Sequence, residues 1–239
     1  MTTKGTLYMI PCPIADTNDV YDVLPAANRS IMDSLDYFIV ENTRTARRFL
    51  SRAGIARPID SLEFVELNEH TRSETDIERM IRPLEEGRSA GVISEAGLPG
   101  VADPGAQAAL AAHRRGIRVV PLVGPSSILM ALMSSGQNGQ SFAFNGYLPI
   151  KEPERSRAIR SFERRAMTEG QCQIFIEAPY RNIKLMQTML ATLSPRSLLT
   201  LACDITSPAE SISTRSVEEW RHTALPDMAK RPTIFILGI

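Results

Sequence analysis

The sequence contains few of the residue types that define several other classes of protein. Its 239 residues include three cysteines, three histidines and one tryptophan. The absence of a CxxC pair or a Cys/His cluster leads us to expect no bound metal, and an odd number of cysteines argues against a disulfide framework. We expect Cys12, Cys172 and Cys203 to be reduced core thiols of a cytoplasmic protein. No apolar run approaches the ~20 residues that span a bilayer.

The chain also lacks net charge, because 27 acidic residues balance 27 basic ones, and this offers no support for nucleic-acid binding. Only four of the basic residues are lysines, which leaves 23 arginines. Arginine binds phosphate bidentately, whereas lysine acts as a point charge. A GC-rich genome produces the same bias, and we prefer that explanation for most of these arginines.

Short apolar runs alternate with helical patterns through the first half of the chain. We expect helices near 19–35, from Thr43, near 73–86, near 104–115 and from a GPSS opening at 124–127. The expected strands are residues 5–11, 37–40, 61–67, 89–94 and 118–123. We interpret the first of these apolar runs as a strand and not as a signal peptide. This order is typical of βα units on a mainly parallel sheet.

The second half has more strand patterns and fewer helices. We expect helices near 153–168 and 180–193, and residues 210–217 alternate as an antiparallel strand with one solvated face does. The expected strands are residues 141–148, 171–178, 197–205, 210–217 and 232–239. We therefore predict an α/β protein of two α/β domains. Residues 1–123 would hold a mainly parallel sheet, residues 124–239 a mixed sheet, and a small-molecule cleft would lie between them.

A loop rich in glycine and proline, VISEAGLPGVADPG at 92–105, joins a strand to a helix. It should therefore lie at the carboxyl edge of the sheet, where ligands bind in open α/β folds. The loop matches neither GxGxxG nor GxxxxGK[ST], so a nucleoside held by backbone groups fits it better than a triphosphate does. On this pattern alone, a structural turn is an equally good interpretation.

Two further bends support the ligand interpretation. Pro125 is expected just inside a helix start, with the hydroxyls of Ser126 and Ser127 after it. The first strand is followed by a proline-rich turn with Asp16 and Asp19, although either aspartate could simply cap the next helix.

Seven collinear segments carry a resemblance that covers nearly the whole chain. They read GTLYMIPCPIADTND, IVENTRTARRFL, GVISEAGLPGVADPG, VVPLVGPSSILMAL, SFAFNGYLP, IFIEAPYR and RPTIFILG. Together they resemble the tetrapyrrole-methylase superfamily, and within it the branch of small-subunit rRNA cytidine-2′-O-methyltransferases. The resemblance implies a two-domain, homodimeric class III methyltransferase that binds S-adenosylmethionine in the cleft between its domains.

The resemblance also implies which positions contact the cofactor, much of it through backbone groups. In the first half these are Pro13, Ala96, Gly97, Leu98, Val101, Ala102, Asp103, Ser126 and Ser127. In the second half they are Ile176 or Glu177, with Leu201, Ala202, Cys203, Pro232 and Thr233.

The chain departs from the rRNA enzymes at four motifs. Their Pro-Ile-Gly-Asn, Asp-Thr-Arg, Asp-Ala-Gly-Thr-Pro and Pro-His-Arg segments are replaced at 13–16, 42–44, 95–99 and 179–181. The sequence stops at Ile239, where those enzymes carry a further small C-terminal domain, so we expect a short form. These differences bear on the substrate more than on the cofactor.

A ribose hydroxyl that accepts a methyl group must lose its proton, and a carboxylate can take it. Glu41, Glu95 and Glu177 each follow an apolar strand and are the possible bases, although a capping or salt-bridge role explains each of them as well. The expected RNA contacts are Arg44, Arg47, Arg48 and Arg181. The first three share a helix face with Arg52, for which solvated ion pairs are the alternative.

The leading hypothesis is thus methylation of a ribose 2′-hydroxyl in small-subunit rRNA. One alternative is a methyltransferase that acts on a tetrapyrrole or another small molecule. Another is a non-catalytic cofactor-binding scaffold.

Overall fold

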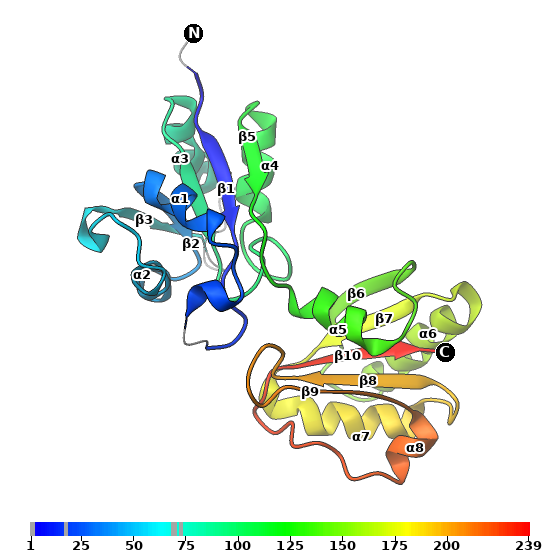
Figure 1. The fold of residues 1–239 in the computed structure, drawn as a ribbon. Helices are drawn as coiled ribbons and strands as arrows, with labels where there is room; N and C mark the ends of the chain where they lie inside the picture. The colour runs from blue at the N-terminus through cyan, green and yellow to red at the C-terminus, as the bar shows by residue number, and fades with distance from the viewer. Residues whose placement is uncertain (1–2, 17–18, 68–70, 72–73) are drawn as a thin grey trace. The chain divides into compact units, whose positions relative to one another are not determined.

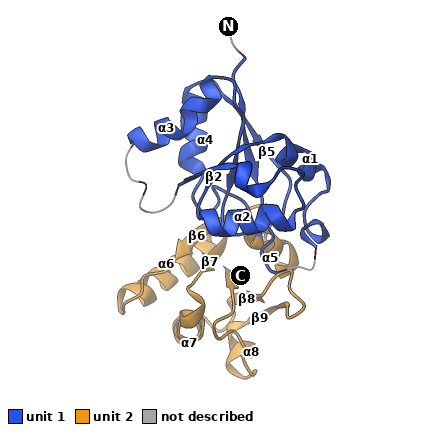
Figure 2. Cartoon of the chain, turned by 90° about the vertical axis from the view of Figure 1, so that its left-hand side faces the viewer, with its two compact units in different colours: residues 1–126 blue, residues 127–239 orange. Residues whose placement is uncertain are grey.

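The computed structural model describes residues 3–16, 19–67, 71 and 74–239. The chain divides into two compact units, Met1–Ser126 and Ser127–Ile239, which Figure 2 shows in different colours. Each unit has its own five-stranded sheet. Within the described residues, no helix is long and apolar enough to cross a membrane.

The sheet of the first unit is parallel throughout, with strand order β3-β2-β4-β1-β5 (Figure 1). Its strands are β1 (Thr6–Ile10), β2 (Tyr37–Val40), β3 (Glu63–Glu66), β4 (Ala90–Ile93) and β5 (Arg118–Pro121). Every residue of β2 and β4 is buried, as expected for central strands covered on both faces. The order reverses direction beside β4 and β1, and in such sheets ligands bind where loops leave neighbouring strands at a reversal.

Helices cover both faces of this sheet. They are α1 (Ala27–Ser34), α2 (Thr43–Arg52), α3 (Glu74–Glu85) and α4 (Ala106–Arg114). Side chains of α1 and α2 pack with Phe38 and Ile93 on one face, while those of α3 and α4 pack with Ile39 and Val92 on the other. The alternation of neighbouring strand residues between the two cores explains why the central strands β2 and β4 are apolar at every position.

The second unit has a mixed sheet in the order β6-β7-β10-β8-β9. Its strands are β6 (Phe142–Tyr147), β7 (Cys172–Ile176), β8 (Leu198–Cys203), β9 (Ser211–Ser216) and β10 (Thr233–Gly238). Only β6 and β7 run parallel to one another, and the other neighbouring pairs are antiparallel. The carboxyl ends of β6 and β7 therefore lie at the same edge of the sheet.

The helices of this unit are α5 (Ser127–Ser135), α6 (Glu154–Glu169), α7 (Asn182–Thr192) and α8 (Val217–Arg221). Helix α5 packs on one face of the sheet against Ile174 and Ile236, and the larger core on the other face includes Phe175 and Phe235. Trp220 of α8 is buried in that larger core and donates a hydrogen bond from Nε1 to the carbonyl of Leu199.

Two helix predictions differ from the structure in extent. The helix expected near 19–35 is a 3-10 turn at Val20–Asp22, capped by Asp19, followed after Pro25 by α1. Pro25 has no backbone N–H to donate, which breaks a continuous helix there. The helix expected to include Pro125 begins only at Ser127. The helix expected from position 73 is α3, and Ser73 itself lies outside the described residues.

Candidate functional site

Two loops at the carboxyl edge of the parallel sheet are joined by backbone hydrogen bonds. The N–H of Cys12, after β1, donates to the carbonyl of Gly97 at 2.8 Å, and the N–H of Gly97, after β4, donates back at 3.1 Å. The Cys12 thiol also lies 3.3 Å from the carbonyl of Ser94. The reciprocal pair fixes the proline-rich turn and the glycine-rich loop against each other.

The segment that leaves β5 closes on the same place. A Cβ on Gly97 would stand 3.6 Å from the carbonyl oxygen of Pro125, and a Cβ on Gly124 would stand only 2.2 Å from Cβ of Pro11. The side-chain amide of Asn28 donates a hydrogen bond of 2.9 Å to the carbonyl of Val123. These contacts hold residues 122–126 outside a helix, which is why α5 begins later than predicted. Three bends that are far apart in the sequence therefore meet in the first unit.

The remainder of the glycine-rich loop forms a closed turn. The N–H of Gly100 donates to the carbonyl of Pro104 at 3.0 Å, and the N–H of Val101 donates to that of Leu98 at 3.2 Å. Ala102 has φ of 65°, a left-handed conformation that costs a residue with a Cβ about 1 kcal/mol or more. Val101 is 44% exposed, so the loop presents apolar surface to solvent.

Acidic side chains gather at this edge of the sheet. The N–H of Glu95 donates to the carboxylate of Glu41 at 3.2 Å, and the hydroxyl of Thr45 donates to the carboxylate of Glu95. The pKa of Glu41 is raised, chiefly by burial and then by the charges of Asp103 and Glu95, while the hydrogen bond from Glu95 opposes the shift. Burial and the charge of Glu95 likewise raise the pKa of Asp103 against a hydrogen bond with Ser94.

A pocket of about 270 Å³ opens beside these carboxylates. It lies between the turn after β1, helix α2 and the start of the loop after β4. Of the predicted site residues, it is lined by Pro13, Glu95 and Arg48. The other lining residues are Cys12, Ile14, Ala15, Asp16, Thr45, Ala46, Phe49, Arg52, Ile93 and Ser94.

The structure divides the arginines of α2 into two kinds. Arg47 pairs with Asp60 and lies 5.9 Å from the centroid of the Phe64 ring, and Arg52 pairs with Asp16 at 3.2 Å. Arg44 and Arg48 are exposed, and the described part of the chain places no ion-pair partner beside either of them. The two free guanidinium groups are one helical turn apart, on the face opposite the buried Ala46 and Leu50.

In the second unit, the predicted cofactor residues come together on neighbouring strands. Ile234 pairs with Ile176 on one side and Ala202 on the other, and Thr233 pairs with Cys203. The side chains of Ile176, Ala202 and Ile234 share the face of the sheet that carries α5. Pro232, just before β10, is exposed, whereas Thr233 is buried.

Leu201 and Cys203 point to the opposite face. Both side chains are fully buried in the larger core, and the Thr233 hydroxyl lies 3.4 Å from the sulfur of Cys203. Burial raises the pKa of the Cys203 thiol. These two positions can therefore offer a ligand only their backbone groups. The three free cysteines are buried, as the sequence predicted.

Glu177, which follows β7, is held in a buried ion pair. Its side chain is fully buried, and Oε1 accepts hydrogen bonds from Nε and Nη2 of Arg181 at 2.8 and 2.6 Å and from the N–H of Ala178. The other oxygen, Oε2, is buried without a hydrogen-bond partner among the described residues. The predicted catalytic residue Glu177 and the predicted RNA contact Arg181 are thus partners in one ion pair.

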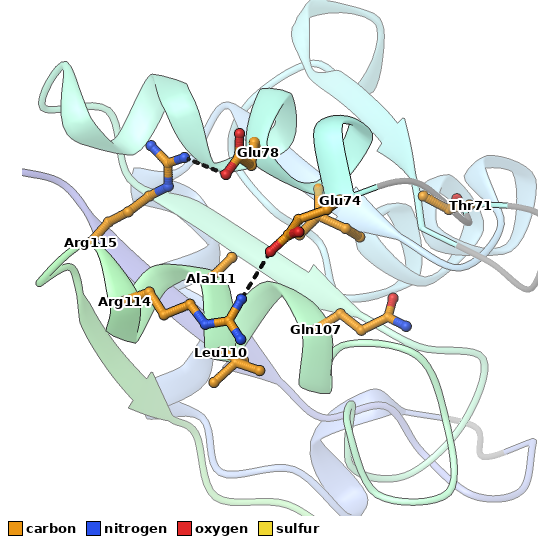
Figure 3. A pocket seen from close by; sticks show the side chains of 9 residues that line it. Thr71, Glu74, Glu78, Gln107, Leu110, Ala111, Arg114 and Arg115 are labelled. Atoms are coloured by element: carbon orange, nitrogen blue, oxygen red, sulfur yellow. Dashed lines mark hydrogen bonds and ion pairs between the residues drawn. The ribbon is translucent and has the colours of Figure 1, made fainter.

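Another pocket, of about 440 Å³, lies elsewhere, between α3 and α4 (Figure 3). Arg114 pairs with Glu74 across it, and Arg115 pairs with Glu78. None of the predicted site residues lines this pocket. Within the described residues, no group of three or more His, Cys, Asp or Glu side chains is arranged to hold a metal ion.

Sequence reasoning missed Thr45, Ser94 and Arg52 as residues of the smaller pocket. Ser94 carried a usable signal, because it directly follows a buried strand and precedes Glu95. Thr45 and Arg52 lie on α2, where only the contact of that helix with the two loops brings them to the site. Asp19 caps the 3-10 turn, which agrees with the capping role that the sequence offered as an alternative to ligand binding. Asp16 instead pairs with Arg52.

Solved structures similar to this chain share one fold. The methyltransferase CobJ matches with a TM-score of 0.61 and 18% identity over 98% of this chain and 94% of its own. Cobalt precorrin-4 methyltransferase matches with a TM-score of 0.58 and 15% identity over the same shares. Uroporphyrin-III C-methyltransferase from Thermus thermophilus, in complex with S-adenosylhomocysteine, matches with a TM-score of 0.54 and 16% identity over 98% of this chain and 97% of its own. The chain has the tetrapyrrole-methylase fold, as predicted.

Sequence relatives specify the branch. Ribosomal RNA small subunit methyltransferase I from Halalkalibacterium halodurans is 32% identical over 221 residues, 92% of this chain and 71% of the relative. The protein of that name from Neisseria meningitidis serogroup B is 32% identical over 90% of this chain and 69% of the relative. No protein-family model matches the chain. The chain belongs to the ribosomal RNA small subunit methyltransferase I family, and the predicted methyltransferase class is confirmed.

The close contact of Gly124 with Pro11 generates a prediction about the three bends. Gly124→Ala should destabilise the protein by about 1–3 kcal/mol, because its Cβ overlaps the proline ring and forces the two segments apart. Gly139→Ala is the matched control, since no atom lies within 4 Å of a Cβ there. Urea denaturation measures both variants. Equal stability of the two would show that the bends are not in tight contact.

The raised pKa of Glu41 predicts a pH-dependent difference in stability. A carboxyl whose pKa is raised on folding stabilises the fold while it is protonated, and this contribution is lost as the pH rises through the folded pKa. Glu41→Gln, which keeps an oxygen to accept from Glu95, should therefore gain thermal stability relative to wild type above the ordinary pKa of 4.5. Melting temperatures from pH 4 to 8 test this. A difference that is constant across the range contradicts it.

Proposed function

We propose that this protein transfers a methyl group from S-adenosylmethionine to a ribose 2′-hydroxyl of small-subunit rRNA. The observation that carries the proposal is the meeting of three bends at the carboxyl edge of the parallel sheet, in a chain of the ribosomal RNA small subunit methyltransferase I family. We also propose that it works in the cytoplasm, where ribosomes are assembled, and as a homodimer. The family resemblance supports the dimer.

The chemistry of the residues fits the cofactor. S-adenosylmethionine is a nucleoside with a sulfonium and an ammonium group, and its S-methyl is an electrophile that an oxygen nucleophile can attack. Glu41 and Asp103, whose pKa values are raised by burial and nearby carboxylates, give this edge an excess of negative charge that a cation relieves. The backbone of Gly97, without a Cβ, allows a nucleoside to approach closely. In our proposal all the predicted cofactor residues of both units contribute, with Leu201 and Cys203 doing so through backbone groups.

The main task of the protein is to hold the acceptor hydroxyl in line with the methyl group. Of the three possible bases, we propose Glu95 as the one that takes the hydroxyl proton. Glu95 lines the smaller pocket and is exposed, so its carboxylate can meet a substrate. A hydroxyl also donates to Oε1 of Glu95, that of Thr45, but Glu95 is the most accessible of the three carboxylates. Glu41 is half-buried, and Glu177 is fully buried with Oε1 held by Arg181.

Arg44 and Arg48 are the proposed phosphate contacts. Their guanidinium groups are exposed on α2, and Arg48 also lines the pocket that contains Glu95. Arginine binds phosphate oxygens in a bidentate manner. Arg47 was expected beside them, but its pairing with Asp60 and Phe64 makes it a weaker candidate.

Transfer of labelled methyl groups from S-adenosylmethionine to 30S subunits that lack their own methylation tests the proposal as a whole. We expect label in the rRNA, at a nucleotide that mass spectrometry shows to carry a 2′-O-methyl group. Cofactor binding without transfer to RNA would favour a small-molecule acceptor or a non-catalytic scaffold. No binding of the cofactor would reject every enzymatic interpretation.

Glu95→Gln should lower kcat by roughly 10²–10⁴, the range typical of general-base catalysis, with a smaller change in KM. Glu86→Gln removes a carboxylate that makes only an exposed ion pair with Arg82, and should leave both constants unchanged. Steady-state methylation at several pH values measures both variants. Full activity of Glu95→Gln would reject its role as the base.

Arg48→Ala should weaken RNA binding and lower the slope of log affinity against log salt by about 0.7, the value for one lost phosphate contact in single-stranded nucleic acid. Arg47→Ala is the matched control on the same helix and should leave the slope unchanged, because Arg47 is paired within the protein. Fluorescence anisotropy over a salt series measures both. A larger fall of the slope for Arg47→Ala than for Arg48→Ala would show that the Arg47–Asp60 ion pair opens when RNA binds.

A further inference from the structure

Two exposed tyrosines lie at the edge of the second sheet where β6 and β7 end. Tyr147 is the last residue of β6 and is 62% exposed, and Tyr180 follows β7 in a 3-10 turn and is 72% exposed. Because β6 and β7 are parallel, their carboxyl ends emerge side by side. Exposed apolar side chains that gather at one place, rimmed by polar groups, can mark a binding site.

The position of Tyr180 is determined by a chain of polar contacts that starts in the protein interior. The buried carboxylate of Glu177 holds the guanidinium of Arg181 through two hydrogen bonds. Arg181 then donates from Nη1 to the hydroxyl of Tyr180 at 2.7 Å, and its guanidinium carbon lies 5.0 Å from the centre of that ring. The ring is thus held against the Arg181 guanidinium although most of it faces solvent.

A bulge in β6 directs Tyr147. The pairing of β6 with β7 shifts register between Phe144 and Tyr147, and Gly146 has φ of 64°, which a residue with a Cβ adopts only under strain. The Asn145 side chain secures the bulge by donating to the carbonyl of Ala143 and to the side chain of Gln173. Bulges commonly redirect a side chain beside a functional site.

Tyr147 lies close in the sheet to the Glu177–Arg181 pair. It pairs across the β6–β7 register with Ile176, the residue before Glu177. An exposed tyrosine ring held against an arginine, with a second exposed tyrosine at the same sheet edge, matches the chemistry of an unpaired nucleobase, which stacks on aromatic rings and guanidinium planes. An apolar protein partner does not require an arginine held against the Tyr180 ring by a buried carboxylate.

We propose that Tyr147, Tyr180 and Arg181 form a stacking site for an unpaired base of the RNA substrate. The inference rests on the proposed function and extends it, because it assigns to this edge of the second unit the recognition of bases in single-stranded RNA. The phosphates are assigned to Arg44 and Arg48 of the first unit.

The test compares RNA binding by Tyr147→Ala, Tyr180→Ala and the matching phenylalanine variants, measured by anisotropy with a labelled single-stranded RNA. We expect each alanine variant to bind about tenfold more weakly and Tyr147→Phe to bind as wild type does, because stacking needs the ring and not its hydroxyl. Tyr180→Phe should lose less than Tyr180→Ala. Phe142→Ala, at the opposite end of β6 and 39% exposed, is the control and should not change binding.

A second arm uses an abasic ribose-phosphate chain of the same length as the RNA. Against this probe the alanine variants should bind as wild type does, since no base is present to stack. Calorimetry with S-adenosylhomocysteine should give the same affinity for all variants, and thermal melting should show that they are folded.

The possible outcomes separate the two proposals. If the wild type binds and methylates RNA while the alanine variants keep full affinity, the stacking site is rejected and the proposed function stands. If the alanine variants lose cofactor affinity instead, the tyrosines belong to the cofactor site. If they change only the oligomeric state in gel filtration, the patch is an interface between copies of the chain. A wild-type protein that binds no RNA rejects both proposals.

Discussion

The candidate site depends on one reciprocal pair of backbone hydrogen bonds, between Cys12 and Gly97. Each residue belongs to a loop that would otherwise leave its strand independently. Once the two loops are joined, the segment after β5 can close on them through Gly124 and Pro125. Backbone contacts of this kind place few demands on side chains, and they allow the local sequence to vary while the shape is kept.

This shape brings three carboxylates together, and burial reduces the solvation of two of them, Glu41 and Asp103. Glu41, Glu95 and Asp103 come from the ends of two strands and from the loop that follows one of them. Their mutual repulsion is tolerable because backbone and hydroxyl donors reach them and because the edge of the sheet is open to water. A cationic cofactor would relieve that repulsion. Relief of the repulsion among the carboxylates would then add to the favourable free energy of cofactor binding.

Much of the fold could be predicted from the sequence because its central strands are short and buried on both faces. The apolar tetrads of β2 and β4 have no other simple interpretation, and the alternating residues of β9 predicted an antiparallel strand with one solvated face. The two failures have different causes, one local and one tertiary. Pro25 interrupts the helix expected near 19–35, and tertiary contacts of Gly124 and Pro125 delay the start of α5.

The site was less predictable than the fold. The position of Glu95 at a strand end indicated its neighbourhood, but the division of the α2 arginines could not be foreseen, because Asp60 and Asp16 reach that helix through the fold. The same holds for Glu177, because its position in the sequence does not show that its carboxylate forms an ion pair with Arg181. Strand ends locate a site by topology, whereas the roles of its side chains depend on partners distant in the sequence.

The most direct measurement of the central claim is a crystal structure of the chain with S-adenosylhomocysteine. The account predicts an adenosyl group in contact with the backbone at Gly97, beside the turn after β1, with the acidic side chains close to the sulfur. A ligand bound between α3 and α4, or absent from the joined loops at saturating concentration, would contradict it.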